Sequence, residues 1–83
     1  MLPDYQNGTD VVNIATKAVI NYTPTENGYL CCLSDATTFS NVNVFEDNVM
    51  IANIANSGTF IVRKGHTYTS SAAIRFARFY PFK

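Results

Sequence analysis

The sequence predicts an all-β protein, a single sandwich or barrel of seven or eight short strands. Three observations support this prediction. Short runs rich in Val, Ile, Phe and Tyr recur at roughly ten-residue spacing along the 83 residues. Turn signals containing Gly, Pro, Asn or Asp separate these runs. The segment 10–18 could form two helical turns, but its apolar residues do not make a helical stripe, so no helix is expected.

The first third of the chain contains a lead-in and two candidate strands. Residues 1–9 form a polar lead-in within a single domain that spans the whole chain. Residues 10–15 and 18–22 are short runs rich in Val and Ile, which we expect to be strands. The segment 23–28 is the clearest loop, because Pro24 follows an extended residue and an Asn-Gly pair ends the segment.

The middle third predicts a central strand and a hairpin. Residues 29–34 are apolar on both faces, which indicates a strand covered from two sides. Residues 35–40 are expected to be a loop. Residues 41–44 alternate asparagine with valine, the pattern of a half-buried strand. The polar turn 46–48 then leads into the apolar run 49–54, which completes the hairpin.

The last third predicts three strands, the last of which runs to the C-terminus. A turn at 55–58 precedes a strand at 59–63, and a tight turn at 64–66 leads into another short strand. The closing strand is expected at 72–81. Its alternation divides the side chains between two faces, Ile74, Phe76, Arg78 and Tyr80 on one and Arg75, Ala77 and Phe79 on the other.

Charge is scarce and unevenly placed. Charged residues make up 14% of the chain, against a typical share of about 25%. The net charge is zero, so we expect neither nucleic acid nor an anionic membrane as a partner. All six acids lie within 4–47, and five of the six bases lie within 63–83. We interpret this as pairing between sequence-distant strands within a sandwich or between identical subunits; the alternative is a basic face for an anionic glycan or phosphate.

The only two cysteines, Cys31 and Cys32, are adjacent. Neighbours in a strand point to opposite faces, so the sulfurs diverge and a disulfide between them is not expected. We interpret them as reduced thiols that act as small core hydrophobes, one on each face, in a reducing cytoplasm. Metal-ligand spacing and Gly-rich phosphate loops are absent from the sequence, and its apolar runs are too short for a membrane span, so we expect no cofactor, no metal and no membrane insertion.

Catalysis is not expected from the available side chains. His66 is the only histidine, so no Ser-His-acid set can form without it, and it lies in a turn. Asp35, Glu46 and Asp47 could supply paired carboxylates for glycoside hydrolysis, but carboxylates in surface loops are more often solubilising. The sequence therefore favours a protein that is not an enzyme.

Two groups of residues are candidates for binding. Tyr22 and Tyr29 flank a loop and could stack on a sugar, and His66 could contact a ligand from its turn. The chain also has more large apolar side chains than two small sheets can hide, so copies of the chain could cover the surplus. The candidates for the core or an oligomer interface are Phe60, Phe76, Phe79, Tyr80 and Phe82.

Five motifs suggest a family. They are Pro-Asp-Tyr at 3–5, Tyr-Thr-Pro-Thr-Glu-Asn-Gly-Tyr-Leu from Tyr22, Val-Phe-Glu-Asp-Asn-Val from Val44, Val-Arg-Lys-Gly-His from Val62, and the ending Phe-Tyr-Pro-Phe-Lys at 79–83. Together they resemble the small C-terminal modules of bacteriophage and prophage tail-fibre or tail-tip proteins. The chain departs from that pattern at 46–48, where the family has Asn-Gly, and at His66, where it has Asp.

The resemblance implies a compact antiparallel β-sandwich that is jelly-roll-like and forms a homotrimeric head at a fibre tip. Such a module is a non-enzymatic part of a virion, is made in the host cytoplasm with its cysteines reduced, and contacts a glycan or protein of the host surface. An alternative that the residues leave open is a free-standing, lectin-like carbohydrate-binding module.

Overall fold

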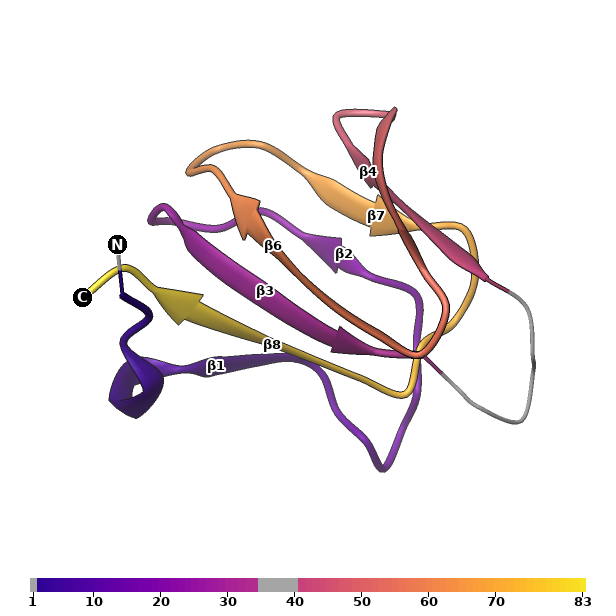
Figure 1. Cartoon of the computed structure of the whole chain (residues 1–83), viewed down its shortest axis with the longest axis horizontal. Helices are drawn as coiled ribbons and strands as arrows, with labels where there is room; N and C mark the ends of the chain where they lie inside the picture. Colours follow the sequence, from indigo (N-terminus) through magenta and orange to yellow (C-terminus); the bar gives the residue numbers. More distant parts are fainter. Residues whose placement is uncertain (1, 35–40) are drawn as a thin grey trace.

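Two four-stranded antiparallel sheets pack face to face in the computed structural model, which describes residues 2–34 and 41–83 (Figure 1). The expected loop at 35–40, with its candidate carboxylate Asp35, lies outside the described residues. The elements are a 3₁₀ turn η1 (Tyr5–Asn7) and strands β1 (Thr9–Val12), β2 (Asn21–Tyr22), β3 (Gly28–Leu33), β4 (Val42–Glu46), β5 (Val49–Ile54), β6 (Ser57–Val62), β7 (Tyr68–Ser70) and β8 (Phe76–Pro81).

The strand order is that of a jelly roll. One sheet has the order β1-β8-β3-β6 and the other has β2-β7-β4-β5. β1 pairs with β8, β2 with β7, β3 with β6 and β4 with β5, as in a long antiparallel ribbon folded over itself. The predicted all-β sandwich is therefore confirmed, with eight strands in the described part of the chain.

The tip of this ribbon is a two-residue hairpin between β4 and β5. Asp47 and Asn48 both have positive φ, 50° and 70°, as a type I′ turn requires. Asp and Asn tolerate this left-handed region better than other residues with a side chain. The turn expected at 46–48 is thus confirmed, and its residue types explain it.

The first two strands are shorter than expected. The strand expected at 10–15 ends at Val12, because the Asn13 side chain accepts a hydrogen bond from the Ala15 N–H at 2.8 Å and the backbone turns. In the segment expected as a strand at 18–22, the Ile20 N–H donates to the Ser70 hydroxyl at 2.8 Å instead of joining a ladder. Side-chain hydrogen bonds therefore replace strand pairing at both places.

The closing strand begins later than expected, at Phe76. The prediction that Ile74 shares the face of Phe76, Arg78 and Tyr80 was wrong: Ile74 lies before the strand, forms an isolated bridge with Ala18 and is completely buried. From Phe76 onward the predicted alternation holds. Ala77 and Phe79 face the core, and the side chains between them lie on the outer face of the sheet.

The core lies between the two sheets and includes one of the two cysteines. Cys32 is buried, whereas Cys31 is half-buried on the outer face of β3, and neither forms a disulfide. Burial raises the pKa of the Cys32 thiol to about 12, with a smaller contribution from the neighbouring Cys31. The buried hydrophobic residues are Val12, Ile20, Leu30, Cys32, Val42, Val44, Ile54, Val62, Tyr68, Ile74, Ala77 and Phe79.

The two ends of the chain pair with each other (Figure 1). The Asp4 N–H donates to the Pro81 carbonyl and the Lys83 N–H donates to the Leu2 carbonyl, each at 2.8 Å. Between these bonds, Pro3 forms a bridge with Phe82. The N-terminal segment is thereby held beside β8. In the described residues, no helix is long and apolar enough to cross a membrane.

Candidate functional site

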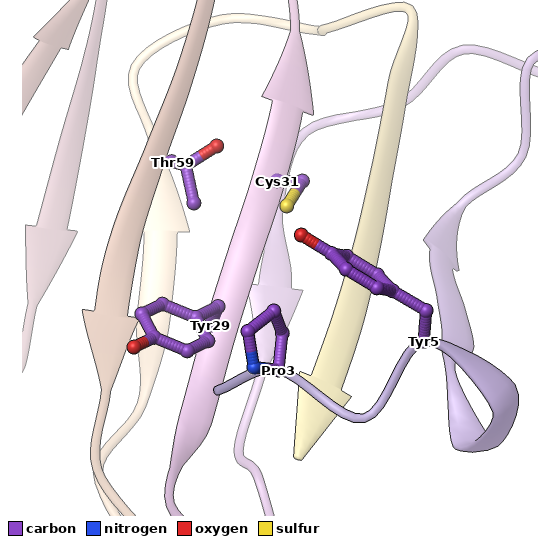
Figure 2. A pocket seen from close by; sticks show the side chains of 5 residues that line it. All are labelled: Pro3, Tyr5, Tyr29, Cys31 and Thr59. Carbon is purple, nitrogen blue, oxygen red and sulfur yellow. The ribbon is translucent and has the colours of Figure 1, made fainter. Parts of the chain in front are cut away.

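A pocket of about 210 Å³ lies on the outer face of the sheet β1-β8-β3-β6 (Figure 2). Tyr29 and Cys31 occupy alternate positions on β3 and so point to the same side. Thr59 on β6 lies directly opposite Cys31 in the antiparallel pair. Pro3 and Tyr5, from the N-terminal segment, complete the wall. Three segments that lie far apart in the sequence thus build one site.

Aromatic contacts hold both tyrosines of the pocket. The Tyr5 ring lies edge-to-face against Tyr80, with 4.8 Å between the ring centroids. The Tyr29 ring meets Phe82 in the same way at 5.0 Å. Such pairs stabilise by about 0.5–1.5 kcal/mol beyond their buried area. The C-terminal segment therefore positions the pocket, because it supplies both supporting rings.

The sequence-derived ligand candidates fall in three different places. Tyr29 lines the pocket. Tyr22 is half-buried on β2 and packs against Phe79 with 5.7 Å between ring centroids; burial, then the charge of Glu26, raises its pKa. His66 lies in the turn between β6 and β7 and does not line the pocket. Only one of the three predicted contacts is therefore at this site.

Sequence reasoning did not predict Pro3, Cys31 or Thr59 as site residues. For Cys31 a signal existed, since strand alternation places it on the face of Tyr29. For Pro3 and Thr59 there was none, because both reach the site through pairing between distant segments.

The predicted core and interface aromatics lie at different depths. Phe79 is in the core at 4% exposure, and Phe60 is half-buried against the core. Phe76, Tyr80 and Phe82 are half-buried near the C-terminus. Since Tyr80 and Phe82 pack on the pocket tyrosines, they have contacts within the chain. Their role in an oligomer interface stays a prediction.

A second polar cluster joins the end of β4 to β6 and β7. The Arg63 guanidinium donates two hydrogen bonds to the Glu46 carboxylate, one of them from Nε at 3.1 Å. The buried Tyr68 phenol also donates to this carboxylate. These bonds, the one from Arg63 first, lower the pKa of Glu46 to about 2. Glu46 is thus an ionised partner for both groups at neutral pH.

The adjacent Asp47 binds the turn between β6 and β7. Its Oδ1 accepts the Thr67 N–H at 2.9 Å, and its Oδ2 lies 2.6 Å from Nδ1 of His66. The backbone bond, followed by that to His66, lowers the pKa of Asp47. The sole histidine is therefore a partner of Asp47.

Glu46, Asp47 and His66 form a group of potential metal ligands within the described residues, with ligand atoms within 4.8 Å of one another. Sequence reasoning missed this group because Asp47 and His66 are nineteen positions apart in the sequence. A divalent cation is a poor match for the site, because the Arg63 guanidinium already occupies the Glu46 carboxylate and adds a positive charge. The contacts of Glu46 with Arg63 and of Asp47 with His66 and Thr67 instead hold the β4–β5 turn against the segment between β6 and β7.

Ion pairs link the acidic and basic halves of the chain. Arg63 pairs with Glu46, and Arg78 pairs with Asp10 across β8 and β1. Arg78 also lies over the Tyr80 ring, with 5.6 Å from its central carbon to the ring centroid. These two ion pairs agree with the interpretation that acids and bases far apart in the sequence pair between strands of one sandwich.

No protein-family model, curated protein or solved structure matches this chain.

Proposed function

We propose that this protein is a non-enzymatic recognition module of a phage virion, a fibre-tip or tail-associated head that assembles as a homotrimer and contacts a host-surface glycan or protein. The trimeric state and the virion location in this proposal rest on the resemblance of the sequence motifs to tail-fibre modules. Jelly rolls occur in viral capsid proteins and lectins, but also in enzymes, so the fold is compatible with the proposal without selecting it.

The observation that carries the proposal is an exposed apolar edge. β5 ends one sheet, and its consecutive residues Val49, Met50 and Ile51 are 65%, 58% and 42% exposed. Because successive side chains point to opposite faces, neither face of this half of the strand is covered. Ile61 on β6, the edge strand of the other sheet, is also exposed. Exposed apolar edge strands are the usual templates for association.

The other edges differ in ways that discourage pairing. β2 is only two residues long. β1 has an irregular register between Asp10 and Val12, and Asp10 places a carboxylate on it. Short strands, bulges and charges protect sheet edges from further pairing. β5 also departs from regular register opposite Val44 and Phe45, but no residue from 49 to 62 is charged. The β5–β6 side is therefore the better candidate for self-assembly.

The polar clusters support a role without catalysis. His66 is engaged by Asp47, and Glu46 is engaged by Arg63 and Tyr68. These bonds stabilise turns. Nε2 of His66 stays available as an acid or base, but His66 does not line the pocket in which a substrate could bind. The pocket is lined instead by two tyrosines, a proline, a cysteine and a threonine.

Sedimentation velocity tests the assembly. We expect the wild-type chain to sediment as a trimer and Met50→Lys to shift it toward the monomer, because the substitution places a charge on the apolar edge. The matched control is Ile14→Lys, which charges another exposed apolar residue away from β5 and should leave the assembly intact. A wild-type chain that stays monomeric up to millimolar concentration would contradict the homotrimer.

The second candidate, a free-standing lectin-like module, is favoured by the pocket at Tyr29. A stable monomer that binds glycans would support this candidate over the fibre-tip head.

A further inference from the structure

We infer that the pocket formed by Pro3, Tyr5, Tyr29, Cys31 and Thr59 binds a single neutral pyranose ring. This inference rests on the proposed recognition function and specifies the ligand class that its pocket accepts. It follows from the pocket's apolar floor, its two flanking hydroxyl groups, its lack of charge and its size.

The floor of the pocket is apolar. In Figure 2, Pro3 and the Tyr29 ring lie below the space, and the Cys31 side chain lies above it. A pyranose ring has a face made of C–H groups, which prefers such a surface to water. Tyrosine side chains suit this contact because they combine a large apolar ring with a polar tip.

Hydroxyl groups flank the floor on two sides. The phenol oxygen of Tyr5 points toward Cys31 from one side, and Thr59 carries its hydroxyl on the other side (Figure 2). Neither hydroxyl has a hydrogen-bond partner in residues 2–34 and 41–83. Each can donate one bond and accept another, which matches the hydroxyl groups around a sugar ring.

Among residues 2–34 and 41–83, no charged side chain lines the pocket. The nearby guanidinium of Arg78 is bound by Asp10 and by the Gly8 carbonyl at 3.3 Å. An acidic sugar or a phosphate would therefore enter the pocket without a free counter-charge, and removing its charge from water would be unfavourable. The pocket thus favours a neutral sugar.

The size of the pocket indicates one ring. Sites for drug-sized ligands measure roughly 300–1,000 Å³, and this pocket measures about 210 Å³. The Tyr80 and Phe82 rings support the two pocket tyrosines, so little side-chain freedom is lost when a ligand binds. We therefore expect one sugar unit to fill the site, such as the end of a glycan chain.

A competing occupant is the apolar side chain of a peptide. A proline or aliphatic group would fit the floor, but it offers no donor or acceptor to the exposed hydroxyls of Tyr5 and Thr59. Sugar hydroxyls can bond to both, and each such bond strengthens binding about fivefold. The two hydroxyls therefore favour the sugar over the peptide.

Two measurements on the full chain test the inference. The first titrates methyl glycosides of glucose, galactose, mannose and N-acetylglucosamine while amide NMR shifts are recorded. We expect at least one glycoside to give saturable shifts at Tyr29, Cys31 and Thr59, with a Kd in the millimolar range. The second follows alkylation of Cys31 by iodoacetamide, which the bound sugar should slow, since Cys31 lines the pocket.

Two isosteric variants locate the binding. Thr59→Val and Tyr5→Phe each remove one flanking hydroxyl and keep the shape, and we expect about a fivefold weaker affinity for at least one of them. The control is Thr9→Val, which removes a hydroxyl from exposed β1 outside the pocket and should not change the affinity.

The inference is overturned if no neutral glycoside gives saturable shifts up to about 100 mM, or if neither variant weakens binding. It is equally overturned if N-acetylneuraminic acid, glucuronic acid or a hexaproline peptide binds more tightly than every neutral glycoside. These outcomes are independent of assembly: a trimer that binds no sugar contradicts only this inference, and a monomer that binds sugar contradicts only the homotrimer.

Discussion

Tyr68 donates the hydrogen of its buried phenol to the carboxylate of Glu46, and the phenol oxygen accepts a hydrogen bond from the Arg63 N–H at 2.6 Å. The two residues join β7 to the end of β4. Because Arg63 also donates to Glu46 through its guanidinium, a single carboxylate connects three elements. This relationship makes the stability of the sandwich sensitive to pH.

The first prediction concerns acid. The pKa of Glu46 falls from 4.5 to about 2 on folding, so its contribution to the free energy of unfolding is fully present above pH 4.5 and is lost as the pH falls through 2. Asp47, whose pKa is also lowered, adds to the same trend. We expect Glu46→Gln to flatten the dependence of unfolding free energy on pH in this window, measured by urea denaturation.

The control for this experiment is Glu26→Gln, which removes an exposed carboxylate from the loop between β2 and β3. This variant should leave the slope of unfolding free energy against pH unchanged. Tyr68→Phe probes the phenol separately. It leaves the Arg63 N–H without its partner, so we expect a loss of about 1–3 kcal/mol at neutral pH. Equal slopes for the wild type and Glu46→Gln would show that Glu46 is not the responsible group.

The second prediction concerns Gly28, at the start of β3. A Cβ atom there would lie 2.3 Å from the backbone oxygen of Tyr80 and 2.6 Å from the Phe79 ring. Backbone cannot rotate away as a flexible side chain can, so Gly28→Ala must displace β8. We expect a loss of about 1–3 kcal/mol, or roughly 4–8 °C in Tm for each kcal/mol.

Gly65→Asn is the comparison variant for thermal unfolding. Gly65 has φ of 82° with open space around it, and asparagine tolerates positive φ, so a small change in Tm is expected. If Gly28→Ala melted at the wild-type temperature, β3 and β8 would not approach each other as closely as the structure indicates.

The third prediction separates the two adjacent thiols. Burial raises the pKa of Cys32 to about 12, so roughly one thiol in 10,000 is ionised at pH 8. Cys31 is half-buried on the outer face and can be reached by reagents. We expect iodoacetamide to modify one cysteine in the native chain, identified as Cys31 by peptide mass spectrometry, and both after denaturation.

Cys31→Ser should abolish the native labelling, whereas Cys32→Ala should preserve it. Labelling of Cys32 at a rate similar to that of Cys31 in the folded chain would contradict its burial.

The fourth prediction concerns the C-terminus. A chain ending at Arg78 loses Phe79 from the core, which alone costs about 3–5 kcal/mol. It also loses the Pro81 carbonyl and the Lys83 N–H, which hold the N-terminal segment. Since domains have about 5–15 kcal/mol of stability in total, we expect loss of cooperative unfolding by circular dichroism.

Removal of Lys83 alone is the control, because it breaks one terminal hydrogen bond and leaves the core intact. A chain ending at Arg78 that melted at the wild-type temperature would show that the terminal strand is dispensable.

Local chemistry explains which features could be predicted from the sequence. Alternating asparagine and valine identified β4, and the polar turn at its end identified the hairpin, because both signals lie within a few consecutive residues. Alternation in the closing strand also placed Phe79 and Tyr80 on opposite faces, and the structure shows that Phe79 is the one in the core. The ends of β1 and β2 could not be predicted, because side-chain hydrogen bonds from Asn13 and Ser70 determine them.

The sequence by itself therefore determined the all-β class, a count of seven or eight strands and the opposite faces of Cys31 and Cys32. These properties depend on side-chain period and turn chemistry, which act over short distances along the chain. Only the tertiary structure decided that Pro3 and Tyr5 meet Thr59, and that Glu46 meets Tyr68. The physical reason is that register between distant strands arises from the packing of the whole sandwich, and no local pattern specifies it.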